Sequence, residues 1–171
     1  YGFESGVPTT TIDDSNNCIF VDPQFVCPEA GVLRLRHTSP CIDAGDNSFV
    51  PSDLQTDILG CPRIVGSSVD IGAYEVQGII YVDGVGGDDT NSGADWSNAL
   101  KTIGAGLSAA DDGWIVVVAD ATYNETDLNF NGKKIYLEGV DYYTAGAKPV
   151  IDCQQAGRAF YFGSGETSDS V

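Results

Sequence analysis

Short apolar segments separated by turn residues are the feature that most limits what this chain can fold into. The longest of them, residues 114–119, is far shorter than the roughly 20 residues of a membrane-spanning helix, so we expect no membrane insertion. The stretches between them are rich in Gly, Pro and Asp, which favour turns. The expected short strands are residues 18–21, 32–36, 69–74, 79–83, 115–118, 128–130, 135–137, 150–152 and 160–162.

Residues 96–110 depart from this pattern. Apolar side chains, among them Ile103 and Leu107, recur there at steps of three and four residues, which is the spacing of one helix face. Asp95 or Ser97 offers an N-cap for such a helix. The sequence therefore predicts one amphipathic helix.

The charge of the chain excludes two classes of partner. Eight Lys and Arg stand against 25 Asp and Glu, which gives a formal net charge of −17. Binding to phosphates requires clustered Lys and Arg, and the sequence has no such cluster. We expect neither a nucleic acid nor an anionic membrane surface as a partner.

Four cysteines, Cys18, Cys27, Cys41 and Cys61, lie in the first third of the chain. Their spacing lacks the close Cys pairs of a zinc site and favours disulfide bonds, with all three pairings open. Disulfides persist in oxidising surroundings, so we expect an extracellular protein, either secreted or on a cell surface. Cys153 stands apart and is either a small buried apolar side chain or half of a bridge to another chain.

Two ordered sets of motifs resemble one protein family. Ser-Pro-Cys-Ile-Asp-Ala-Gly at 39–45 is followed by Asp-Ile-Leu-Gly-Cys-Pro-Arg at 57–63 and Val-Asp-Ile-Gly-Ala-Tyr-Glu at 69–75. This set resembles the closing segment of secreted bacterial right-handed parallel β-helix proteins of the pectate-lyase-like kind. A second set resembles the opening segment of the same family, including the helix that caps its first rung. Its members are residues 81–83, 91–93, 96–100 and 119–123.

The resemblance implies an all-β fold with right-handed parallel β-helix rungs, one short capping α-helix at 96–110 and a loop-rich, disulfide-stapled segment. Strand spacing alone leaves an antiparallel sandwich equally open. The implied modules are a closing-type segment at 1–77 and an opening-type segment at 78–171. Because the closing segment comes first, the chain is either a junction between successive β-helices or a permuted unit whose open ends are completed by neighbouring copies.

This order predicts a non-catalytic extracellular structural protein, a repeating unit of a surface fibre or filament that assembles head-to-tail with copies of itself. The alternatives are a glycan-binding module and a fragment of a β-helix polysaccharide lyase or hydrolase. We expect no catalytic residues. His37, the sole histidine, has no second histidine or nucleophile to support it, and acidic pairs such as Asp111-Asp112 fit turns.

One loop could bind a cation. Asp83, Asp88, Asp89 and Asn91 gather oxygen-bearing side chains among glycines, which suits calcium, the one cofactor that we consider. The spacing lacks the acidic residue that ends an EF-hand loop. A flexible Gly-rich turn is the alternative.

Two further features concern carbohydrate. Tyr142 and Tyr143 lie outside any clear strand and could stack on the sugar rings of a polysaccharide partner, whereas aromatic residues within strands are more often part of a core. Asn124 opens an Asn-Glu-Thr glycosylation acceptor sequence.

Overall fold

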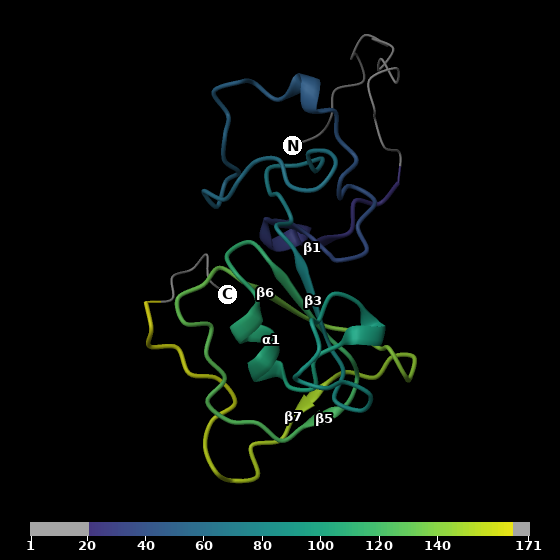
Figure 1. Cartoon of the computed structure of the whole chain (residues 1–171), viewed down its shortest axis with the longest axis vertical. Helices are drawn as coiled ribbons and strands as arrows, with labels where there is room; N and C mark the ends of the chain where they lie inside the picture. The colour runs from purple at the N-terminus through teal and green to yellow at the C-terminus, as the bar shows by residue number, and fades with distance from the viewer. Residues whose placement is uncertain (1–20, 166–171) are drawn as a thin grey trace.

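A computed structural model describes residues 21–165 of the chain. Figure 1 shows the loop-rich residues 21 to about 77 toward one end of the long axis, and the main sheet with its helix toward the other end. No helix among residues 21–165 is long and apolar enough to cross a membrane. The elements are β1 (Phe25–Cys27), η1 (Pro28–Ala30), β2 (Val32–Leu35), η2 (Asn47–Phe49), β3 (Ile79–Val82), η3 (Trp96–Asn98), α1 (Ile103–Ala109), β4 (Ile115–Val118), β5 (Thr122–Tyr123), β6 (Tyr136–Gly139) and β7 (Val150–Ile151).

The main sheet has three parallel strands in the order β3-β4-β6, paired without a shift in register. The central strand β4 is Ile-Val-Val-Val, and all four of its residues are buried. A strand that is covered on both faces reads as a continuous apolar run, which is why residues 115–118 lack an alternating pattern. Two smaller sheets accompany it, the parallel pair β5-β7 and the antiparallel hairpin β1-β2.

Helix α1 packs against β3 and β4 and closes the core. Ile103 and Leu107 are each 1% exposed, as the helical periodicity predicts. Gly106 is also buried, and a Cβ atom built there would lie 2.7 Å from Cγ2 of Val82 and 3.0 Å from Cγ1 of Val116. The absence of a side chain at Gly106 therefore lets the helix backbone approach the sheet.

The prediction of an all-β fold with parallel β-helix rungs is wrong. The described residues form a small mixed α/β arrangement with three separate sheets, none of which winds into a solenoid. Residues 128–130 and 160–162, expected as strands, form no strand and share one isolated bridge, between Leu128 and Phe160. The reason is strand length, because strands of two to four residues between Gly- and Asp-rich turns make too few consecutive hydrogen bonds to extend one sheet.

The expected helix at 96–110 is divided in two. Asp95 caps η3 by accepting a hydrogen bond from Asn98 N, and Thr102 caps α1 by accepting one from Ala105 N. Between them Leu100 lies extended beside β3, where its N donates to Tyr81 O at 2.9 Å. Hydrogen bonding to the edge of the sheet outweighs the helical periodicity of this segment.

The prediction of a disulfide-stapled segment is also wrong. Cys27, Cys41, Cys61 and Cys153 are free thiols, and Cys18 lies outside the described residues. Residues 69–74 are likewise not a strand but a series of bends. Hydrogen bonds to buried carboxylates hold this part of the chain together instead.

Glu75 is the centre of these hydrogen bonds and is 2% exposed. Its carboxylate accepts from Arg63 Nη1 at 2.8 Å and from the backbone N of Val65 and of Asp70, each at 3.0 Å. Asp57 accepts in turn from Glu75 N at 3.1 Å. Backbone N–H groups in loops have no neighbouring strand to donate to. Here the side-chain carboxylates accept these hydrogen bonds instead.

Candidate functional site

An open hollow of about 470 Å³ lies where the loop-rich segment meets the main sheet. We call it the Tyr142 hollow. Its lining combines two aromatic side chains with basic and acidic ones. The lining residues are Arg36, His37, Thr38, Trp96, Glu138, Gly139, Val140, Asp141, Tyr142 and Lys148.

Glu138 is the buried acidic group of this hollow. It lies on β6, and its side chain is 5% exposed. Arg36 Nη1 donates to its Oε1 at 3.0 Å, and His37 N donates to its Oε2 at 3.3 Å. The His37 Nδ1 atom lies 2.9 Å from the same Oε2. Residues that follow β2 thus neutralise a carboxylate of the main sheet.

The charge state of Glu138 follows from these contacts. Burial alone raises the pKa of this carboxyl, but the hydrogen bonds from the side chain and backbone of His37, together with Arg36, outweigh burial and hold the pKa below its usual value. Glu138 is therefore ionised at neutral pH. A carboxylate only accepts hydrogen bonds, so the proton of the contact with His37 is on Nδ1.

Four aromatic rings contact one another in series, and two of them, Trp96 and Tyr142, line the hollow. Trp96 lies between Tyr81, at a centroid distance of 4.8 Å, and Tyr142, at 4.2 Å. Tyr143 meets Tyr142 edge to face at 4.9 Å. The rings of Tyr142 and Tyr143 remain 46% and 49% exposed. This exposure leaves aromatic surface for a ligand.

The loop that carries these tyrosines is held by two carboxylates. Asp120 accepts hydrogen bonds from Tyr143 N and Thr144 N at 2.5 and 2.9 Å. The Tyr143 hydroxyl donates to Asp83 Oδ2 at 2.5 Å, which raises the pKa of Tyr143 to about 12. Tyr142 is therefore presented by a fixed backbone, which lowers the entropy cost of binding.

The proposed calcium ligands have other partners in the structure. Asp83 accepts from Tyr143 and from Val85 N, and Asp88 accepts from Thr90. The described residues contain no group of three or more His, Cys, Asp or Glu side chains that could hold a metal ion. Calcium gains no support from this geometry and stays a prediction.

The last two members of that loop make similar contacts. Asp89 accepts from the backbone N of Lys101 and Thr102, each within 2.9 Å. Asn91 donates from Nδ2 to Ala99 O at 3.0 Å. These bonds tie the Gly-rich loop to the segment that precedes α1.

Asn124, the predicted glycosylation acceptor, is exposed. Its neighbour Glu125 accepts hydrogen bonds from Ile103 N and Gly104 N at 2.7 and 2.8 Å, at the start of α1. The acceptor site lies away from the residues that line the Tyr142 hollow. Glycosylation of Asn124 remains a prediction.

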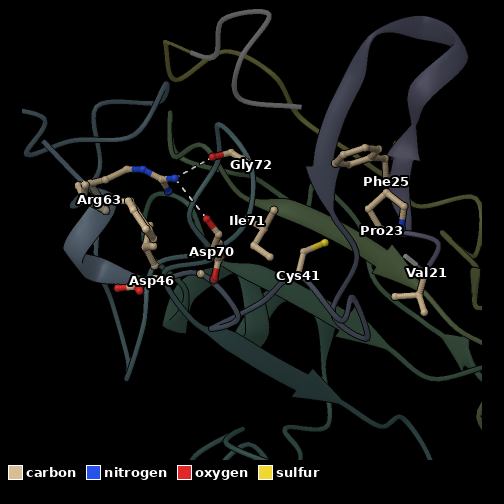
Figure 2. A pocket seen from close by; sticks show the side chains of 13 residues that line it. Val21, Pro23, Phe25, Cys41, Asp46, Arg63, Asp70, Ile71 and Gly72 are labelled. Atoms are coloured by element: carbon tan, nitrogen blue, oxygen red, sulfur yellow. Dashed lines mark hydrogen bonds between the residues drawn. The ribbon is translucent and has the colours of Figure 1, made fainter. Parts of the chain in front are cut away.

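A second hollow, of about 610 Å³, lies within the loop-rich segment and is mainly apolar (Figure 2). Phe25 lies on one side of it and Arg63 on the other. The Arg63 guanidinium donates from Nη2 to Gly72 O at 2.7 Å and from Nη1 to Glu75. The charge of Arg63 is therefore already paired within the loop-rich segment. The hollow presents few polar groups that could bind a ligand.

Three residues of the Tyr142 hollow, Arg36, Glu138 and Lys148, were not identified from the sequence. One signal was present, because the acidic residue Glu138 directly follows the apolar segment 135–137 that is expected as a strand. A charged residue on a buried strand face needs a partner. No pattern in the sequence indicates that this partner is Arg36-His37, about a hundred residues earlier.

Comparison with family models, with curated proteins and with solved structures gives no match for this chain.

Proposed function

We propose that this chain is a glycan-binding module and that the Tyr142 hollow holds a sugar unit of a polysaccharide. The observation that carries this proposal is the exposed Tyr142 ring, stacked on Trp96, beside the fixed polar cluster of Arg36, His37 and Glu138. A sugar ring offers C–H groups to an aromatic face and hydroxyls to such polar groups, and the hollow supplies both.

The charges favour an uncharged glycan. Arg36 and Lys148 line the hollow with Glu138 and Asp141, so its own charges nearly balance. The whole chain carries a formal charge of −17, which repels polyanions at long range. Neutral polysaccharides meet no such barrier. An extracellular location remains part of the proposal and rests on the proposed polysaccharide ligand, since the described cysteines are free thiols.

Electrophoresis in native gels that contain a soluble polysaccharide tests this function. Xylan, mannan and β-glucan represent neutral ligands, and polygalacturonate represents an acidic one. We expect retardation by at least one neutral polymer, and a loss of affinity of about tenfold or more, or roughly 1.4 kcal/mol, in Tyr142→Ala. Tyr161→Ala, which changes an exposed ring outside the hollow, is the matched control. Unretarded migration in every gel would refute the function, and equal retardation of Tyr142→Ala would refute the site.

A second candidate is the structural role, in which copies of the chain associate. The observation that favours it is the open edge of the main sheet, because β6 is the last strand of the order β3-β4-β6 among the described residues. An apolar hollow of about 200 Å³ adjoins that edge, and its lining includes Leu137 and the rings of Phe130 and Phe162. Unpaired strand edges promote pairing with another chain.

Association through this edge is tested by negative-stain electron microscopy and by light scattering of the eluted protein. If copies pair there, the wild type forms filaments or oligomers and Phe162→Asp shifts it to monomer. Phe49→Asp, at a phenylalanine that is 68% exposed and lies in the loop-rich segment, should have no effect. A wild type that is monomeric at high concentration would exclude this role.

A further inference from the structure

We propose that the Tyr142 hollow also hydrolyses acyl esters carried by the sugar that it holds, with His37 as the general base. This proposal rests on the glycan-binding function above and adds a reaction to it. The substrate class is a neutral, O-acylated polysaccharide. Water is the only co-reactant.

The arrangement of His37 is that of an oriented base. Its Nδ1–H group faces Glu138 Oε2 at 2.9 Å, and in the neutral imidazole this tautomer has its lone pair on Nε2. No described residue forms a hydrogen bond with Nε2. Every side-chain N or O atom that is buried among the described residues does have a partner, so an atom without one is not buried. Nε2 is therefore open to solvent, although only 14% of the His37 side chain is exposed. A base held by a carboxylate on one nitrogen and free on the other is suited to proton transfer.

Glu138 is the positioning residue of this pair. Its side chain is 5% exposed and is fixed independently by Arg36, whose Nη2 also donates to Val26 O at 3.2 Å. The carboxylate therefore holds the imidazole in one tautomer and stabilises the imidazolium that forms during proton transfer. In the reaction it acts through His37 and not on the ester itself.

The reaction balances with the groups present. A water molecule gives a proton to His37 Nε2 while its oxygen forms a bond to the acyl carbon, and the carbonyl oxygen takes the electron pair. When this intermediate collapses, the bond between the acyl carbon and the sugar oxygen breaks. The sugar oxygen then takes the proton from Nε2. The products are a sugar hydroxyl and a carboxylic acid.

Positive charge is available for the oxyanion that this step creates. The Arg36 side chain is 42% exposed, and its guanidinium has five N–H groups, of which the contacts with Glu138 and Val26 occupy two. Lys148 lines the same hollow. Cationic donors beside a developing oxyanion lower the barrier of acyl transfer.

Release of acetate from acetylated xylan is the decisive measurement. The substrate is an alkyl ester because free imidazole already cleaves activated aryl esters. The rate measured with imidazole at the same molar concentration as the protein is the baseline. We expect His37→Gln, which keeps an N–H group for Glu138 but lacks the base, to lose at least a hundredfold in rate. His37 is the sole histidine of the chain, so any loss on histidine modification reports on this residue.

Two further variants separate chemistry from binding. Glu138→Gln should lower kcat by tenfold or more with KM little changed, which a merely structural role would not produce. Tyr142→Ala should raise KM for acetylated xylan. The same proteins are run in native gels with deacetylated xylan, where Tyr142→Ala should lose retardation and Tyr161→Ala, which lies outside the hollow, should be retarded as strongly as the wild type.

The outcomes distinguish the two proposals. Retardation by xylan without acetate release above the imidazole baseline overturns the hydrolase and leaves glycan binding intact. Equal acetate release by the wild type and His37→Gln overturns the assignment of His37 as base. Absence of both retardation and release overturns the binding function and the hydrolysis that rests on it.

Discussion

His37 and Glu138 lie 101 residues apart in the chain, and their Nδ1 and Oε2 atoms are 2.9 Å apart. Together with Arg36, this contact joins the loop-rich segment to the edge strand β6. It also forms the polar wall of the Tyr142 hollow. One buried carboxylate thus contributes to stability and to the candidate site.

Glu138→Gln tests the contribution of this contact to stability. The pKa of Glu138 lies below its ordinary value of 4.5, so its stabilising effect is present above that value and is lost as the pH falls through the lowered pKa. We expect the variant to be less stable than the wild type by about 1–3 kcal/mol at pH 7, with the difference shrinking between about pH 5 and pH 3. Urea denaturation across this range measures it.

Comparison of the two proteins at each pH removes the effects of other carboxyl groups. Burial raises the pKa values of Asp70 and Glu75, so both favour the folded state more as the pH falls, which is the opposite sign. Ser52→Ala, at an exposed residue without an ionisable side chain, is the control and should differ from the wild type by less than about 0.5 kcal/mol at every pH. A constant gap between Glu138→Gln and the wild type would contradict the assignment.

Tyr143→Phe tests the hydrogen bond that anchors the Tyr142 loop. The bond to Asp83 raises the pKa of Tyr143 to about 12, and burial raises that of Tyr123 to about 12 as well. Ultraviolet titration of the folded protein should therefore show late-ionising tyrosines, with one fewer in the variant. The variant should also be less stable by about 1–3 kcal/mol. Asp83 is 5% exposed, and without the Tyr143 hydroxyl its Oδ2 atom loses its hydrogen-bond donor. Identical titration curves would rule out the bond.

Gly106→Ala tests the close approach of α1 to the main sheet. Alanine favours an isolated helix by about 1 kcal/mol over glycine, but the added Cβ would lie 2.7 Å from Val82 Cγ2. We expect a net loss of about 1–3 kcal/mol in the free energy of unfolding, because the packed core cannot yield without strain. Ser108→Ala, on the exposed side of the same helix, should change stability by less than about 0.5 kcal/mol. A stabilised Gly106→Ala would contradict the packing described.

Thiol labelling tests the replacement of disulfides by carboxylate contacts. Cys41 and Cys61 are 4% and 8% exposed, and burial together with Asp57 and Asp112 raises the pKa of Cys61. Iodoacetamide should therefore modify the half-buried Cys27 and Cys153 of the native protein first. Denaturation without reductant should then expose Cys41 and Cys61 to the reagent. Mass spectra that show these two cysteines blocked before reduction would restore the disulfide hypothesis.

The sequence by itself determined the local elements. The apolar runs at 79–82 and 115–118 are β3 and β4, and Ile103 and Leu107 lie on the buried face of α1, because strand and helix periodicity depend on neighbours within one segment. It also identified Tyr142 as a ligand-contacting candidate, and the structure places this residue in the hollow.

Only the tertiary structure decided how these elements combine. The three sheets stay separate because strand pairing depends on contacts between distant segments, which short strands with long turns leave undetermined. Leu100 lies outside the helix because its N donates to Tyr81 O and its O accepts from Asp83 N. The site arises in the same way. Arg36 and His37 meet Glu138 because the fold buries a charge on β6, and a buried charge is stable only where another part of the chain supplies its partner.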